Sequence, residues 1–208
     1  FPVRGRQGEN ADEDRGERVL FIKPRPLVAL MSVNRSTLHA VIPMAVTYGY
    51  HIVISGYGIW LPGDERGHWS TAWDAELGFI EPHTLHPGDP VRKRMAQERQ
   101  KHPRVVLTNA MIAVVEGQVG KCAAESEWSV GAASIEPTHT HLLLTYTTRD
   151  IDNVVKWLKD QTTKAIHRQT THGGPVWSKG KWRSFIFDTN YWHNTKSYIE
   201  KHNERRGV

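Results

Sequence analysis

Two histidines in residues 137–146 stand at a spacing that could bind a metal ion. The stretch is an apolar run with Thr and Tyr, entered from a proline, which is typical of a buried strand. Alternate side chains of a strand share a face, so His139 and His141 point the same way and Thr140 points the opposite way. Neutral imidazoles on one rigid strand can together hold a divalent ion. Two histidines on a solvated sheet face are the common alternative, because so short a motif often matches by chance.

A second pair of reactive side chains lies near the C-terminus. Tyr198 and His202 are four residues apart in a segment with helical character, so both project from one helix face. If that helix crosses the open face of the sheet, three imidazoles would surround one ion and leave positions open for a substrate oxygen. The hydroxyl of Tyr198 beside it could act as a nucleophile. Its ordinary pKa of about 10 makes it weak alone, so it would need the ion or a nearby base. The alternatives are a core tyrosine and a solvated histidine near a helix end.

The elements that must position these residues follow from periodicity and end signals. Alternating and β-branched runs predict strands at residues 48–57, 128–135, 138–147 and 182–187. Helical spacing and capping residues predict helices at residues 89–101, 108–124 and 151 to about 170, with a last one from Asp188 or Thr189 to about Arg205. Residues 68–88, with scattered Trp, Pro and Gly, indicate a long loop.

This order of elements predicts an α+β fold. Strand, helices, strand, strand, helix, strand is the ferredoxin-like, split β-α-β arrangement, an antiparallel sheet with helices on one face. The C-terminal helix that bears Tyr198 is an addition to it. The histidine strand is then a central one.

Composition sets the broad class. A chain of 208 residues suits one domain with or without a tail, and 38% hydrophobic with 24% charged residues is globular. No apolar run approaches the ~20 residues of a membrane span. A single cysteine, Cys122, excludes an internal disulfide and fits the reducing cytoplasm. We expect residues 1–47 to be a partly disordered extension and residues 48–208 to be the catalytic domain, because residues 1–18 are polar and lack periodicity.

The charge is uneven along the chain. Residues 151–208 hold 11 Lys and Arg against 5 Asp and Glu, a net of +6, whereas residues 1–150 hold 16 against 17, a net of −1; together they give the overall +5. A basic segment with interleaved tryptophans is typical of a surface that binds a phosphate backbone. For charge alone, a solvated helix face is the competing interpretation.

Three stretches resemble the single-tyrosine HUH transposases, in particular the REP-associated tyrosine transposases. Residues 50–53 with 57–67 are similar to the opening strand and Trp-Leu-Pro-Gly loop of that family. Residues 137–144 are similar to its histidine strand. Residues 176–177, 182–185 and 198–200 are similar to its last strand and tyrosine helix. Together they span about residues 48–207, and the ordered set is more specific than any one piece.

The resemblance implies a role for each reactive residue. His139 and His141 would be metal ligands, and Tyr198 would be the nucleophile. The third ligand of the family falls one turn after the tyrosine, on His202, where an amide side chain is more typical. Thr140 also departs from the pattern, which has an apolar residue there, and the chain ends soon after the tyrosine helix.

The resemblance also implies a reaction: single-stranded DNA is cleaved and rejoined through a 5′-phosphotyrosine intermediate with Mg²⁺ or Mn²⁺. The enzyme would be a metal-dependent DNA transposase or nickase acting on single-stranded or hairpin DNA. Whether it is a monomer or a homodimer stays open. The residues expected to contact DNA are basic or aromatic: Arg66, Lys179, Lys181, Trp182 and Arg183.

Two other functions remain possible at this point. The departures from the family pattern fit a catalytically weakened module of the same fold that only binds nucleic acid. A metal-dependent hydrolase that uses the histidines and an activated water is the second. A covalent protein–DNA adduct would separate both from the transposase reaction.

Overall fold

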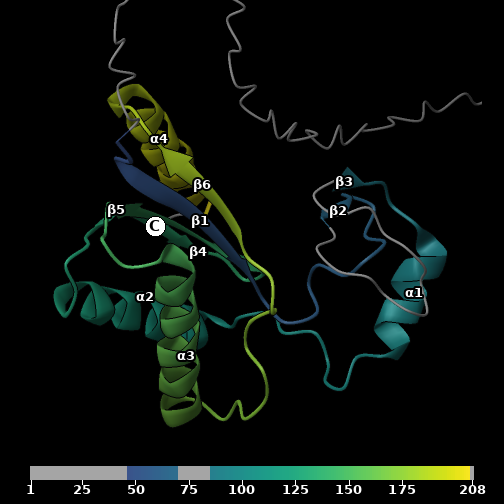
Figure 1. The fold of residues 1–208 in the computed structure, drawn as a ribbon. Coiled ribbons are helices and arrows are strands. Elements are labelled where there is room, and N and C mark those ends of the chain that lie inside the picture. Colours follow the sequence, from purple (N-terminus) through teal and green to yellow (C-terminus); the bar gives the residue numbers. More distant parts are fainter. Residues whose placement is uncertain (1–45, 70–84, 207–208) are drawn as a thin grey trace, which may run out of the picture. The chain divides into compact units, whose positions relative to one another are not determined.

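A four-stranded antiparallel sheet carries the histidine strand in the computed structural model, which describes residues 46–69 and 85–206 (Figure 1). The strands are β1 (Gly49–Ser55), β4 (Val130–Ile135), β5 (His139–Thr145) and β6 (Trp182–Ile186). Their order in the sheet is β4-β5-β1-β6, and every pair is antiparallel. The predicted α+β fold is therefore confirmed, with β5 as a central strand.

Helices α2 (Asn109–Ala124) and α3 (Ile151–Gln169) begin where the sequence predicts them to begin. The side chain of Thr108 accepts the N–H of Met111, and that of Asp150 accepts the N–H of Asn153, so each helix has a capped N-terminus. The apolar residues of one face of α2 are buried, at Met111, Ile112, Val115, Val119 and Cys122.

The main hydrophobic core joins α2 and α3 to one face of the sheet. Ile52 and Ile54 of β1 and Leu142 and Leu144 of β5 contribute to it from alternate positions. Thr140 lies on this same face and is 1% exposed. The alternation of β5 is thus as predicted, because the positions of His139 and His141 point away from this core.

Helix α4 (Thr189–Arg206) packs on the opposite face, over a smaller core of Leu143, Ile186 and Ile199. Asp188, one of the two residues predicted to open this helix, accepts the N–H of Tyr191 at 2.7 Å and so caps it. The C-terminal helix therefore covers the face from which the two histidines project. The sheet has helices on both faces once α4 is included.

Trp192 of α4 lies against the backbone of two strands. A β-carbon on Gly49 of β1 or on Gly131 of β4 would overlap the Trp192 indole. Tyr48 packs its ring edge-on to the same indole, with ring centres 5.3 Å apart. Near the other end of the helix, the Asn203 amide donates to the Ala133 carbonyl at 2.9 Å. These contacts set the height and direction of α4 on the sheet.

The segment between β1 and α2 differs from its prediction in one respect. Helix α1 (Pro90–Glu98) forms within the predicted range of residues 89–101, and Asp89 is its N-cap. Two short strands, β2 (His68–Trp69) and β3 (Leu85–His86), pair with each other inside the stretch predicted as a loop. The loop prediction is wrong at these ends, because two-residue strands leave no periodic signal. The predicted extension at residues 1–47 lies almost wholly outside the described residues and stays a prediction.

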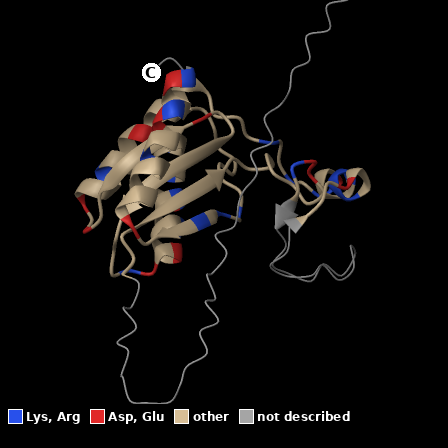
Figure 2. Ribbon diagram, turned by 90° about the horizontal axis from the view of Figure 1, so that it is seen from above, with Lys and Arg blue, Asp and Glu red and all other residues tan. Residues whose placement is uncertain are grey.

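Within the part of the chain that the structure describes, no helix has the length and apolar content required to cross a membrane. Figure 2 shows basic and acidic positions interspersed over the helices, while the strands carry few charges. Most basic residues of 151–208 therefore lie on helices among acidic residues, whereas Lys179, Lys181 and Arg183 lie at or just before β6.

Candidate metal and nucleophile site

Strands β5 and β1 place three histidines on the face covered by α4. In the antiparallel register, His141 pairs with Val53 and His139 with Ser55, so His51, two residues before Val53, shares their face. The rings of His139 and His141 are 4.8 Å apart, and that of His51 is 5.3 Å from His141. His51 and His141 are 7% and 5% exposed. The result is a row of imidazoles, two of them buried, on rigid backbone.

Helix α4 adds Tyr198 and His202 to this row. The ring of His202 lies 4.8 Å from that of His141, and the ring of Tyr198 lies 4.8 Å from His202 and 5.6 Å from His141. Tyr198 remains 37% exposed. The structure thus brings together the four residues that the sequence analysis singled out. Potential ligand atoms of His139, His141 and His202 all lie within 4.8 Å of one another, close enough to hold one ion.

Each of these three imidazoles has its Nδ1 atom engaged by a neighbour. His139 Nδ1 is 2.9 Å from Thr138 Oγ1, and His141 Nδ1 is 3.1 Å from His51 Nε2. His202 Nδ1 contacts Glu136 Oε1. A histidine ligand usually donates its second ring N–H to such a partner, which fixes the tautomer and the ring orientation. Nδ1 contacts at all three positions leave the Nε2 atoms as the candidate ligands.

Burial keeps the histidines of the strands neutral. It lowers the pKa of His141 to about 2, with His139, His51 and His202 adding to the effect, and it lowers that of His51 to about 4. The pKa of His139 is also lowered by burial, although Glu136 opposes this. Neutral imidazole is the form that binds metal. At neutral pH these side chains are therefore ready to act as ligands without first losing a proton.

The nucleophile candidate is protonated at neutral pH. Burial raises the pKa of Tyr198, and the charge of Glu136 raises it further, while Arg205 acts in the opposite direction. A phenol in this state is a poor nucleophile. Tyr198 would therefore need a bound cation or a proton acceptor close to its hydroxyl to react.

Two residues of this site escaped the sequence analysis. His51 belongs to a strand whose register with β5 cannot be read from one sequence. Glu136 lies in the turn between β4 and β5, where its N–H donates to the His139 carbonyl at 2.8 Å. The one sequence signal that could have indicated Glu136 as part of the site was its position three residues before His139.

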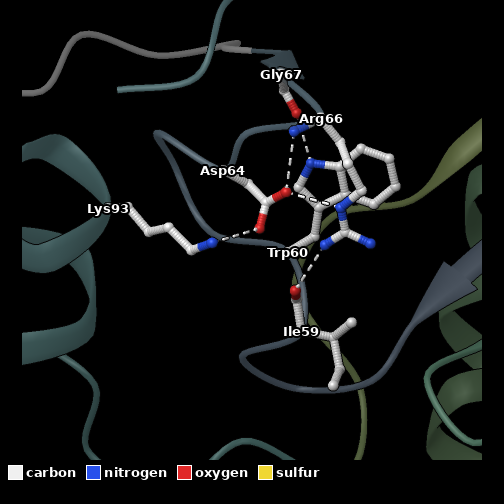
Figure 3. A network of polar contacts seen from close by, with 6 residues as sticks. All are labelled: Ile59, Trp60, Asp64, Arg66, Gly67 and Lys93. Atoms are coloured by element: carbon white, nitrogen blue, oxygen red, sulfur yellow. Dashed lines mark hydrogen bonds and ion pairs between the residues drawn. The ribbon is translucent and has the colours of Figure 1, made fainter. Parts of the chain in front are cut away.

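Arg66, a candidate for DNA contact, is tied into its own loop (Figure 3). Its Nε donates to Asp64 at 2.7 Å, its Nη2 donates to the Ile59 carbonyl at 3.1 Å, and its guanidinium stacks on Trp60 with 4.5 Å to the ring centre. Lys93 forms a second ion pair with Asp64 at 3.4 Å. The side chain of Arg66 is still 50% exposed, so it keeps a free edge.

The other four DNA-contact candidates surround the start of β6. Trp182 packs edge-on to His51, with ring centres 5.1 Å apart, so it adjoins the histidine row. Lys181 and Arg183 both pair with Asp152 at the start of α3, at 3.3 and 2.7 Å. Lys179 is exposed. Trp182 is therefore the one of the four that contacts a residue of the site.

The Lys159 ammonium of α3 organises the loop that precedes β6. It donates to the carbonyls of Ser178, Lys179 and Gly180 at 2.9, 3.3 and 2.7 Å. The loop that carries Lys179 is thereby held to the helix. The side chain of Lys179 therefore extends from a backbone that is held in place.

The sequence pattern of the family described as "Transposase IS200 like" matches residues 98–202. This stretch is 105 of the 208 residues and contains the histidine strand and the part of the tyrosine helix up to His202. The chain belongs to the IS200-like transposase family. It is therefore a transposase-like DNA-processing protein, and the resemblance found in the sequence is confirmed.

Two solved structures are similar to this transposase-family chain. One, a Deinococcus radiodurans R1 protein described as a transposase, has 14% identity and a TM-score of 0.41; the match covers 83% of this chain and 98% of that one. The other is a REP-associated tyrosine transposase bound to a REP hairpin, with 14% identity and a TM-score of 0.44, covering 85% of this chain and 75% of that one. No curated protein matches the sequence.

Proposed function

We propose that this protein cleaves and rejoins single-stranded DNA, with Tyr198 as the nucleophile and a divalent ion held by His139, His141 and His202. The observation that carries the proposal is the position of Tyr198, whose ring lies within 4.8 Å of His202 and 5.6 Å of His141. Membership of the transposase family supports DNA as the substrate.

The donor set fits a divalent ion. Three imidazoles whose Nδ1 atoms are engaged elsewhere offer their Nε2 atoms as ligands from two elements, β5 and α4. Nitrogen ligands suit Mn²⁺ and later transition metals better than Mg²⁺, which prefers oxygen. Of the two ions that the family resemblance implies, Mn²⁺ is therefore the better match. When bound, the ion supplies positive charge that polarises the scissile phosphate.

The bond changes of the proposed reaction take place at Tyr198. The Tyr198 oxygen attacks phosphorus, a bond forms between them, and the bond from phosphorus to the 3′ oxygen breaks. The Tyr198 proton is lost and the leaving 3′ oxygen gains one, so the products are a 5′-phosphotyrosine and a free 3′-hydroxyl. Attack by a 3′-hydroxyl on the phosphotyrosine reverses the step and joins the strands. In-line attack requires the Tyr198 hydroxyl to lie about 3–3.5 Å from the phosphorus atom. Helix α4 would hold Tyr198 in position for this attack.

The DNA partner we propose is a single strand, including one that adjoins a hairpin. Trp182 offers a ring for base stacking next to the site, and Lys179, Lys181 and Arg183 offer charge at and just before the start of β6. Arg66 is proposed as a further phosphate contact through its exposed edge. These contacts are independent of base identity, so target sequence would be read elsewhere or by the folded shape of the hairpin.

A cleavage assay tests the proposal. Hairpin oligonucleotides with randomised single-stranded flanks are labelled at either end and incubated with the full chain and Mn²⁺. We expect the 3′-labelled fragment to remain on the protein in a denaturing gel and the 5′-labelled fragment to be released. The double variant His139→Ala, His141→Ala should lose both products while its circular dichroism stays unchanged.

Two outcomes would contradict the proposal. Cleavage with turnover and no adduct would indicate a metal-dependent hydrolase. Tight DNA binding with neither cleavage nor adduct would indicate a binding module of the same fold.

A further inference from the structure

Among the residues that the structure describes, Glu136 is the one carboxylate that contacts two of the three histidines. Its Oε1 accepts from His202 Nδ1, and its Oε2 is 3.6 Å from His139 Nε2. The side chain of Glu136 is 17% exposed and that of His202 is 15% exposed. The pair is thus largely shielded from solvent, where a carboxylate acts more strongly on its partner.

The two contacts of Glu136 are of different kinds. A neutral imidazole that donates from Nδ1 to a carboxylate has its lone pair on Nε2, at the other side of the ring. The distance of 3.6 Å to His139 exceeds a hydrogen bond, so that Nε2 atom also remains available. Glu136 therefore selects one nitrogen of His202 without occupying a candidate ligand atom of His139.

We propose that Glu136 is a positioning residue. By its contact with Nδ1 of His202, it orients that ring so that the Nε2 atom of His202 binds the metal. This inference rests on the proposed function, because it assumes that His202 binds the ion. A carboxylate that accepts from a ligating imidazole fixes the ring and raises its basicity. Glu136 would thereby strengthen a nitrogen ligand at a position where the family pattern typically has an amide.

A purely structural role for the pair is less well supported. Helix α4 is already joined to β4 by the Asn203 amide, which donates to the Ala133 carbonyl at 2.9 Å. Ile199 and Trp192 fasten the same helix through apolar contacts. The helix therefore has docking contacts that do not involve Glu136, and the contribution of Glu136 should appear mainly in metal affinity.

The first test is a titration of the metal-free full chain with Mn²⁺ and with Co²⁺ by calorimetry, without DNA. Loss of an outer partner of a ligand typically costs 10–100-fold in affinity. We expect a loss of about this size in Glu136→Ala and a smaller one in Glu136→Gln, whose amide oxygen still accepts a hydrogen bond. Glu200→Gln, which removes a charge from an exposed residue of α4, is the matched control and should bind as the wild type does.

The second test is the tautomer of His202, read from long-range ¹H–¹⁵N spectra of the metal-free protein. The wild type should show the Nδ1–H form, and Glu136→Ala should lose that preference while the fold is retained. Equal affinity in wild type and Glu136→Ala, or an Nε2–H tautomer in the wild type, would overturn the inference. Both measurements are made without DNA, so a failure to cleave DNA would count against the proposed function and leave these results interpretable.

Discussion

Each residue of the candidate metal site is held by a neighbour that is not itself proposed as a ligand. His141 illustrates this, because its Nδ1 atom is 3.1 Å from Nε2 of His51 and both rings are buried. For His141 to bind an ion through Nε2, its Nδ1 must carry the proton, and His51 must then accept it. The neutral state that burial gives His51 is the state in which it can accept.

Replacement of His51 tests this arrangement. His51→Phe keeps a ring of similar size but removes the acceptor, so Mn²⁺ affinity by calorimetry should fall by roughly 10–100-fold. His51→Gln, which keeps an acceptor, should recover part of the loss. His193→Phe, at an exposed histidine of α4, is the control and should bind normally. An unchanged affinity in His51→Phe would show that His51 only fills space.

At the scale of elements, the position of α4 decides whether the site is assembled. The helix lies close to the sheet because Gly131 has no side chain where the Trp192 indole rests. Gly131→Ala should push the helix outward and lower the free energy of unfolding by about 1–3 kcal/mol, as other overpacked sites do. Adduct formation by the folded protein should fall as well, because Tyr198 moves with the helix.

Urea unfolding and the adduct assay measure these two effects. The control is Gly120→Ala in α2, where an added β-carbon meets nothing within 4 Å, so stability should be unchanged or slightly raised. If Gly131→Ala is as stable and as active as Gly120→Ala, Trp192 does not set the position of the helix.

The elements were largely predictable from the sequence, whereas the contacts among them were not. Alternation in β5 and the spacing of Tyr198 and His202 are local signals, so the two halves of the site could be placed on a strand and a helix. His51 enters the site through a strand register, and Glu136 through a contact with a residue 66 positions away. Such pairings depend on the tertiary fold. The β2–β3 pairing was missed for a simpler reason, because two-residue strands have no period.

At the scale of the molecule, charge should govern DNA binding. The net charge of +6 in residues 151–208 predicts that affinity for single strands falls with salt, with a log–log slope of about −0.7 per phosphate contact. Fluorescence anisotropy with a labelled oligonucleotide at several salt concentrations measures this slope. An affinity that does not change with salt would remove the electrostatic basis for binding.

The proposed division of the chain also belongs to this scale. We propose that residues 1–47 are an extension that the catalytic domain, residues 48–208, does not need. A chain that starts at Met44 should melt cooperatively at nearly the same temperature as the full chain, because β1 begins at Gly49. A large drop in the melting temperature would show that the removed residues pack on the domain.

The central claim is that Tyr198 forms the covalent bond to DNA, and a single hydroxyl tests it. Tyr198→Phe removes one oxygen and keeps the ring that packs against His141 and His202. The comparison is Tyr191→Phe, because the Tyr191 hydroxyl lies 2.9 Å from Ser184 Oγ and is not part of the proposed site.

Adduct formation on 3′-labelled single-stranded hairpin DNA is the measurement, read as a protein band that carries the label in a denaturing gel. We predict no adduct with Tyr198→Phe, near-normal Mn²⁺ and DNA binding by the same variant, and a normal adduct with Tyr191→Phe. A labelled protein band from Tyr198→Phe at the wild-type level would contradict the account.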